Sequence, residues 1–129
     1  MAIIKSFTDL SQSKVLAEFL PLESADMCFN ISQRHNMPPL MTPYIKFNEF
    51  FNMETPNFLI PCWSLGALID VLPDTITSND GIAFKLNIKK NIIEYSNPPL
   101  YLIYKSVKSD NIVDACYEMI LKLHEQNIL

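Results

Sequence analysis

Two stretches of the chain place hydrophobic side chains at helical spacing between a capping residue and a proline. The first covers residues 10–20, with Asp9 as the candidate N-cap and Gln12 placed to complete a capping box. The second runs from Ser64 to residue 72, because the Ser64 hydroxyl can accept hydrogen bonds from the backbone N–H groups that open a helix. We expect a helix over each stretch.

Residues 82–88 show the clearest strand pattern, because apolar and polar side chains alternate along them. Two further apolar runs follow at residues 92–96 and 100–107, and short connections precede both of them. Strands joined in this way form an antiparallel meander. We expect three strands here, with one or two more contributed by the middle of the chain.

A third helix is expected to start near Asn111, with Asp114 in its first turn. Its apolar side chains fall on one side of the helix, which is therefore expected to pack on the sheet, at Ile112, Val113, Cys116, Met119, Ile120 and Leu123. The predicted class is α+β, in the approximate order α-(irregular/β)-α-β-β-β-α, with two to three helices packed against the meander. A chain of 129 residues is expected to form a single domain, residues 1–129.

Residues 22–62 have several prolines and no sustained period. Residues 27–31 are a candidate strand, and residues 42–51 could form either a short helix capped by Thr42 or a strand. The large apolar side chains here exceed what one regular face can bury, and they form a candidate partner surface: Tyr44, Phe47, Phe50, Phe51, Met53, Phe58, Ile60 and Trp63. The alternative, favoured by the small size of the core, is that this segment folds over the sheet.

Composition narrows the class of protein. General nucleic-acid binders depend on a basic surface, whereas this chain has a net charge of −4 and a pI near 5.0. We therefore expect no nucleic-acid partner. No apolar stretch approaches the length of a membrane span, and no secretory signal is recognisable, so we predict a soluble, cytoplasmic protein. Cys28, Cys62 and Cys116, widely spaced and odd in number, indicate reduced thiols.

Three segments carry a resemblance to a known family. They read LPLESADM at residues 20–27, PCWSL from residue 61 running to LP at residues 72–73, and DN at 110–111 followed by DACYEMI at 114–120 and LHE at 123–125. Together they resemble a family of small uncharacterised proteins encoded by gut bacteria, their phages and other mobile elements. The resemblance covers about half of the chain and implies a biological setting, but no activity, cofactor or catalytic residue.

The candidates for chemistry are few. Cys62 could be a nucleophile, because a following helix can lower a thiol pKa, but without a local His or Asn partner a buried apolar role fits better. Glu23 and Asp26 could form a carboxylate pair, although turn formation and capping also explain them. His35 and His124 are interpreted as surface residues, and the wide spacing of the Cys and His residues predicts no metal site. With only two glycines, a glycine-rich phosphate loop is excluded, and we expect no cofactor.

Two functional hypotheses follow. The first is a non-catalytic protein-interaction or regulatory module of a mobile-element family, which binds an unknown partner or itself through residues 44–63 or an exposed sheet edge. The second is a small enzyme or ligand-binding domain with a pocket near Cys62. A third, an RNA-binding domain, rests only on an α-β-β-β-α order at the end of the chain, and the acidic start of the last helix opposes it.

Overall fold

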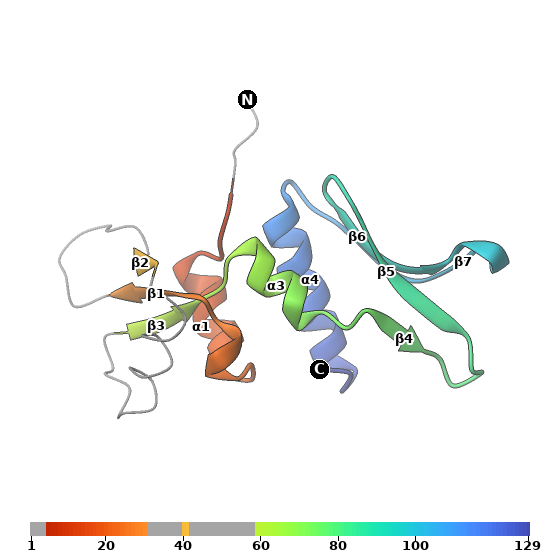
Figure 1. The fold of residues 1–129 in the computed structure, drawn as a ribbon, viewed down its shortest axis with the longest axis horizontal. Helices are drawn as coiled ribbons and strands as arrows, with labels where there is room; N and C mark the ends of the chain where they lie inside the picture. Colours follow the sequence, from red (N-terminus) through yellow and green to blue (C-terminus); the bar gives the residue numbers. More distant parts are fainter. Residues whose placement is uncertain (1–4, 31–39, 42–58) are drawn as a thin grey trace. The chain divides into compact units, whose positions relative to one another are not determined.

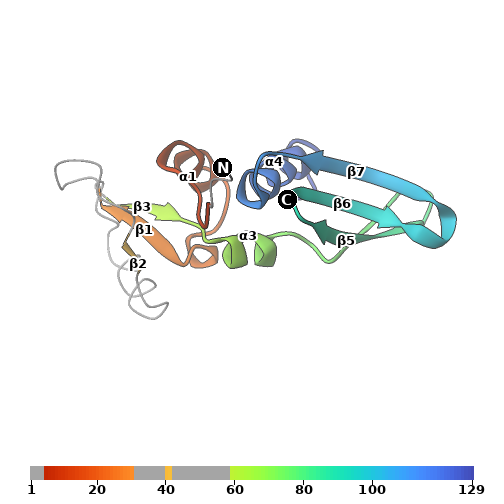
Figure 2. The same cartoon turned by 90° about the horizontal axis from the view of Figure 1, so that it is seen from above.

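The computed structural model describes residues 5–30, 40–41 and 59–129 of the 129-residue chain. Within them lie three α-helices and two antiparallel sheets, which confirms the predicted α+β class (Figures 1 and 2). The chain divides into two compact units, one of residues Ser6–Ala67 and one of Leu68–Leu129 together with Lys5. The single domain stays a prediction.

The first unit combines a helix with a three-stranded antiparallel sheet. Helix α1 (Leu10–Ala17) contacts strand β3 (Leu59–Cys62), which pairs with β1 (Met27–Asn30). On the other side of β1 lies the short strand β2 (Leu40–Met41), so the order is β2-β1-β3. Strand β1 confirms the predicted strand up to Asn30. Residues 31 and 42–51 lie outside the described residues, so the prediction of a helix or strand there stays a prediction.

Helix α1 begins as its sequence predicts. The Asp9 carboxylate accepts a hydrogen bond from the Gln12 backbone N–H at 2.8 Å, and the Gln12 side-chain oxygen accepts one from the Asp9 N–H at 3.1 Å. The helix ends at Ala17, three residues before the predicted end. There the N–H groups of Glu18 and Phe19 bond three residues back, which tightens the last turn and stops the α-helical pattern.

Helix α3 (Leu65–Val71) follows Ser64, and the division between the units falls within it. The Ser64 Oγ accepts a hydrogen bond from the Ala67 N–H at 3.2 Å, so Ser64 caps the helix as predicted. Just before the helix, an isolated antiparallel bridge joins Phe7 to Ser64. This bridge ties the residues that lead into α1 to the start of α3.

The second unit contains the predicted meander, with one more strand than the meander segments predicted. The strands are β4 (Thr75–Thr77), β5 (Ala83–Lys89), β6 (Ile92–Asn97) and β7 (Leu102–Lys108), and each pairs antiparallel with the next. The additional strand β4 has only one buried side chain, Ile76. An element of this length cannot show a period, which is why its sequence did not reveal it.

Helix α4 (Ile112–Glu125) packs against β6 and β7, as its apolar side predicted. Its start is capped by Asn111, whose side-chain oxygen accepts the Asp114 N–H at 2.9 Å. The core of this unit contains residues of both the helix and the sheet, at Phe84, Ile93, Tyr95, Val107, Val113, Ala115, Cys116, Met119, Ile120 and Leu123. The Tyr95 hydroxyl donates to the Pro73 carbonyl at 2.7 Å, which satisfies the polar end of a buried ring.

Candidate protein-interaction surface

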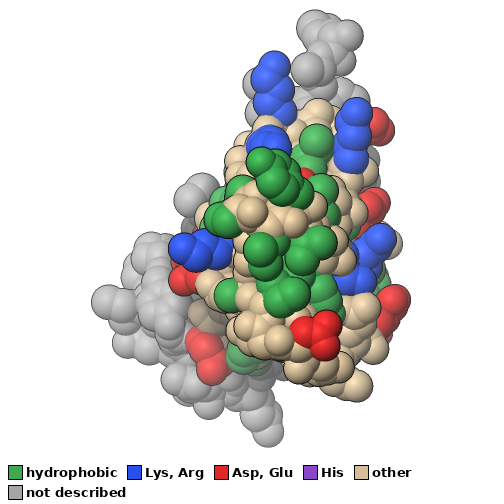
Figure 3. Space-filling view, turned by 90° about the vertical axis from the view of Figure 1, so that its right-hand side faces the viewer, with side chains coloured by type: hydrophobic (Ala, Val, Ile, Leu, Met, Phe, Trp, Pro, Cys, Tyr) green, Lys and Arg blue, Asp and Glu red, His purple; other side chains and the backbone are tan. Residues whose placement is uncertain are grey.

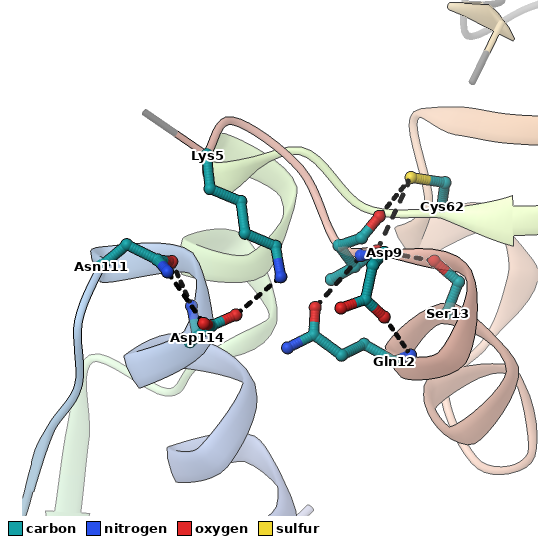
Figure 4. A network of polar contacts seen from close by, with 8 residues as sticks. Lys5, Asp9, Gln12, Ser13, Cys62, Asn111 and Asp114 are labelled. Atoms are coloured by element: carbon teal, nitrogen blue, oxygen red, sulfur yellow. Dashed lines mark hydrogen bonds and ion pairs between the residues drawn. The ribbon is translucent and has the colours of Figure 1, made fainter. Parts of the chain in front are cut away.

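Cys62 is fully buried at the end of β3. Its thiol donates to the Thr8 carbonyl, with an Sγ–O distance of 3.4 Å, and lies 3.6 Å from the Thr8 Oγ1 (Figure 4). Burial raises the pKa of the Cys62 thiol, and this effect outweighs the hydrogen bonds from Thr8 and Ser13, which lower it. A raised pKa disfavours the thiolate that a nucleophile needs, so these surroundings fit the buried apolar role.

The polar groups around Cys62 have structural roles. Thr8, also buried, accepts a hydrogen bond from the Trp63 backbone N–H at 3.2 Å and shares one with the Ser13 hydroxyl at 2.8 Å. The backbone N–H of Thr8 in turn donates to the Trp63 carbonyl at 3.0 Å. Thr8 therefore joins α1 to the segment between β3 and α3.

The predicted carboxylate pair of Glu23 and Asp26 has different surroundings at its two members. Asp26 accepts hydrogen bonds from the Ser64 backbone N–H at 2.9 Å and from the Ser64 hydroxyl. Asp26 thus supports the residue that caps α3, whereas Glu23 is exposed in the short 3-10 helix η1 (Leu22–Ser24). These contacts match the capping interpretation of Asp26.

Of the predicted apolar partner surface, only the end falls within the described residues. Residues Tyr44, Phe47, Phe50, Phe51, Met53 and Phe58 lie outside them, and Ile60 is half-buried. Trp63 is fully buried, and its indole N–H donates to the Ser24 hydroxyl at 2.9 Å. Trp63 is therefore a core residue in this structure and presents no surface to a partner.

The other candidates show no arrangement for chemistry. His35 lies outside the described residues, and His124 is exposed in the last turn of α4 with its Nδ1 3.0 Å from the Leu129 carbonyl oxygen. Cys116 is buried within α4, and desolvation raises its pKa to about 11. Within the described residues, no group of three or more His, Cys, Asp or Glu side chains could hold a metal ion.

A different surface stands out at the connection between β6 and β7. Five consecutive apolar side chains are exposed there, with exposed fractions of 54% for Leu100, 94% for Tyr101, 41% for Leu102, 63% for Ile103 and 36% for Tyr104. We call these five residues the apolar tip. Single exposed apolar residues are ordinary, but a contiguous group of this kind marks an interaction site in many proteins. Figure 3 shows hydrophobic side chains gathered into one patch, with Lys and acidic side chains around it.

The backbone of the apolar tip is held by local contacts. Residues Pro98–Leu100 form the 3-10 helix η2, which Asn97 caps by accepting the Leu100 N–H at 3.2 Å. The Asn97 side chain also donates to the Ala83 carbonyl at 3.0 Å and so ties the turn to β5. Because two prolines restrict the backbone and Asn97 anchors it, the tip is presented in a preformed shape, and binding would cost little ordering entropy.

The tip continues into the edge strand of the sheet. Strand β7 is last in the order β4-β5-β6-β7, and its burial rises from exposed Leu102 and Ile103 to buried Val107. A β-bulge interrupts its pairing with β6 between Tyr95 and Ser96. The Tyr104 ring, next to this bulge, contacts Phe84 with ring centroids 5.3 Å apart.

The strands beside the tip are basic. Residues 83–108 contain five lysines and one glutamate, a net charge of +4, whereas the whole chain has a net charge of −4. The glutamate, Glu94, is itself held by Lys89 at 3.5 Å and by the Asn87 side chain at 3.3 Å. The meander is thus a positively charged region of an acidic chain, with apolar side chains at one end.

Comparisons with protein-family models, with curated proteins and with solved structures find no match. The resemblance to proteins of gut bacteria and their mobile elements therefore stays a prediction. Among the described residues, no helix combines the length and hydrophobicity needed to cross a membrane.

The tip lies within residues 100–107, which were predicted to form a strand, but its exposure was not predicted. A half-buried strand alternates between apolar and polar residues, whereas Leu100-Tyr101-Leu102-Ile103-Tyr104 is an unbroken apolar run directly after two prolines. Such a run is typical either of a strand buried on both faces or of an exposed binding segment. The unbroken apolar run was therefore the signal available in the sequence, but it did not distinguish these two cases. The position of β7 at the edge of the sheet favours the exposed segment.

Proposed function

We propose that this chain is a non-catalytic protein-interaction module and that the apolar tip is its binding surface. The observation that carries the proposal is the exposure of five consecutive apolar residues, Leu100 to Tyr104, on a turn held by Asn97. Aromatic and aliphatic side chains on a preformed turn supply the anchors on which interface affinity depends. The setting that we propose is the cytoplasm of a bacterium, where a mobile-element protein would meet its partner.

The surroundings of Cys62 favour this function over the alternative of an enzyme with a cysteine nucleophile. The thiol is fully buried and its pKa is raised, so it has neither substrate access nor thiolate character. The side chains of the apolar tip, in contrast, are accessible to another molecule.

Site-specific photocrosslinking in the host cell tests the proposal. A photoreactive phenylalanine derivative replaces Tyr101, which is 94% exposed, so the substitution should leave folding unchanged. A matched control places the same residue at Glu118, exposed on α4. We expect a discrete crosslinked protein from position 101 that position 118 does not give. The same crosslinks from both positions, or none from either, would refute the proposed surface.

A second variant links the crosslink to binding. Ile103→Ser, combined with the photoreactive residue at position 101, removes an anchor whose side chain is 63% exposed. Because little buried area is lost, thermal stability should stay close to that of the parent. The crosslinked product should decrease several-fold if the tip binds the partner. An undiminished product would show that the tip only lies near another protein.

A further inference from the structure

The proposed function does not specify what kind of partner binds the tip. The exposed edge of the sheet narrows the choice of partner. Strand β7 is seven residues long, and no strand in the described part of the chain pairs with its outer side. Such an edge presents backbone N–H and C=O groups that an extended segment of another chain can pair with. The apolar tip begins at the turn before β7 and shares its first three residues, Leu102 to Tyr104.

The charges on β7 argue against a second copy of this chain as the occupant. A two-fold antiparallel pairing over the full strand is centred on Lys105, so Lys105 would face its own copy. Like charges directly opposite each other across a strand pair are destabilising.

The same charges favour an acidic partner. Lys105 and Lys108 lie on the edge strand itself, within residues 83–108, whose net charge is +4. Lys108 is exposed and Lys105 half-buried, with its ammonium 6.0 Å from the centroid of the Tyr104 ring. A carboxylate opposite each lysine would supply the complementary charge, and apolar side chains would cover the tip.

We propose that the outer edge of β7 binds an extended, acidic protein segment as an added antiparallel strand. The spacing follows from the strand: the residues opposite Lys108 and Lys105 are three positions apart, and those opposite Ile103 and Leu102 come two and three positions later. The segment therefore carries two acidic residues three apart, followed by two adjacent apolar residues. This inference rests on the proposed function and names the partner of the same surface.

Aliphatic side chains at the tip favour a protein over a nucleic acid. Leu100, Leu102 and Ile103 offer no hydrogen bonds and no stacking surface to bases, whereas they can be buried against apolar side chains of an added strand.

Selection from a phage-displayed library of random peptides on the immobilised full chain tests this inference. We expect enrichment of peptides with acidic residues three apart followed by apolar residues. On the Lys105→Glu/Lys108→Glu variant, the enriched peptides should carry Lys or Arg at the same positions. Selection on Lys122→Glu, which makes a charge change of the same kind on the exposed side of α4, should return the original acidic peptides.

Binding of a synthetic peptide with the enriched sequence gives the magnitude. Loss of both lysine contacts should weaken its affinity at least about tenfold, while Lys122→Glu should change it less than about twofold. Circular dichroism of each variant checks that the fold is retained. An absence of enriched peptides, or the same peptides on the wild type and the charge-reversed variant, would overturn the inference.

Three further measurements would overturn it by showing a different occupant. These are a dimer in sedimentation equilibrium that Lys105→Glu alters, binding to phosphatidylserine vesicles, and binding to polyuridine, each dependent on the apolar tip. Photocrosslinking at position 101 separates the two proposals. A crosslinked partner without enriched acidic peptides refutes only the inference about its chemistry, whereas failure of both experiments refutes the surface itself.

Discussion

Replacing Cys116 with alanine should remove part of the protein's loss of stability in alkaline solution. Cys116 is fully buried in α4, and burial raises the pKa of its thiol from 9.0 to about 11. The folded chain thus keeps a proton that the unfolded chain releases. The resulting stabilisation is complete below pH 9.0, where the thiol is protonated in both states, and it is lost as the pH rises toward about 11.

The size of the effect follows from the two pKa values. Between the two pKa values, the Cys116 thiol keeps one proton in the folded chain that it has lost in the unfolded chain. The free energy of unfolding therefore decreases by about 1.4 kcal/mol by pH ~10, and by about 2.7 kcal/mol once the pH exceeds both pKa values. Cys116→Ala also loses packing in the core, but that cost is the same at each pH. The comparison is therefore the difference between the stabilities at pH ~8 and pH ~10, measured for both proteins by urea denaturation.

A matched control separates the thiol from the packing. Ile120→Val, at a fully buried position on the same helix, should lose about 1 kcal/mol at both pH values and keep the pH dependence of the wild type. Between the two pH values, the free energy of unfolding of Cys116→Ala should decrease by about 1.4 kcal/mol less than that of the wild type or of Ile120→Val. Equal losses in all three proteins would refute the argument that burial of this thiol contributes to the loss of stability in alkaline solution.

Three other substitutions test local contacts by chemical denaturation. Thr8→Val should lower the free energy of unfolding by about 2 kcal/mol, because it leaves the Trp63 N–H without this acceptor and the Ser13 hydroxyl without this hydrogen-bond partner. Thr8→Ser should keep most of the stability, and equal stabilities of the two variants would contradict this role. Gly81→Ala should cost about 1 kcal/mol, because Gly81 has φ +83° even though the space around it is open. Gly66→Ala should instead stabilise by about 0.5 kcal/mol, since its new methyl group meets only the Ser64 Oγ at 3.8 Å; effects of the same sign at the two glycines would contradict the backbone argument.

The elements that could be predicted from the sequence are those whose signals are local. The caps at Asp9, Ser64 and Asn111 act within one helical turn. Asp9 and Ser64 accept the hydrogen bonds that their positions predicted, and Asn111 lies where the third helix was expected to start. The alternation along residues 82–88 likewise reports one buried face and gave β5. In both cases the residues that determine the structure lie next to each other in the chain.

The first sheet could not be predicted in the same way, because its pairing is non-local. Strand β1 pairs with β3 so that Cys28 lies opposite Pro61, more than thirty residues away. A proline argues against a strand in the interior of a sheet, but β3 is at the edge in the order β2-β1-β3, where a missing N–H can be tolerated. Only the sheet order, which no local pattern contains, makes Pro61 compatible with a strand.

The candidate surface illustrates the same limit for function. Apolar residues predict burial, and along β7 that expectation holds for Val107 but not for Leu102 or Ile103. Their exposure depends on where α4 covers the sheet and on which strand is at its edge, both of which are tertiary properties. From the sequence, the partner surface was predicted within residues 44–63, because one regular face could not bury all the large apolar side chains there.

The structure of the tip supports the proposed interaction function. A surface turn needs only residues that tolerate its backbone, and polar residues would serve as well in water. Here the turn is instead fixed by Asn97 and two prolines, and it carries side chains that gain about 1.5–3 kcal/mol each when fully buried. An unattached apolar turn could fold back to cover such side chains, but this anchored turn keeps them accessible. Holding Tyr101 and Ile103 in water, after a turn whose Asn97 is bonded to β5, makes physical sense when another protein covers them.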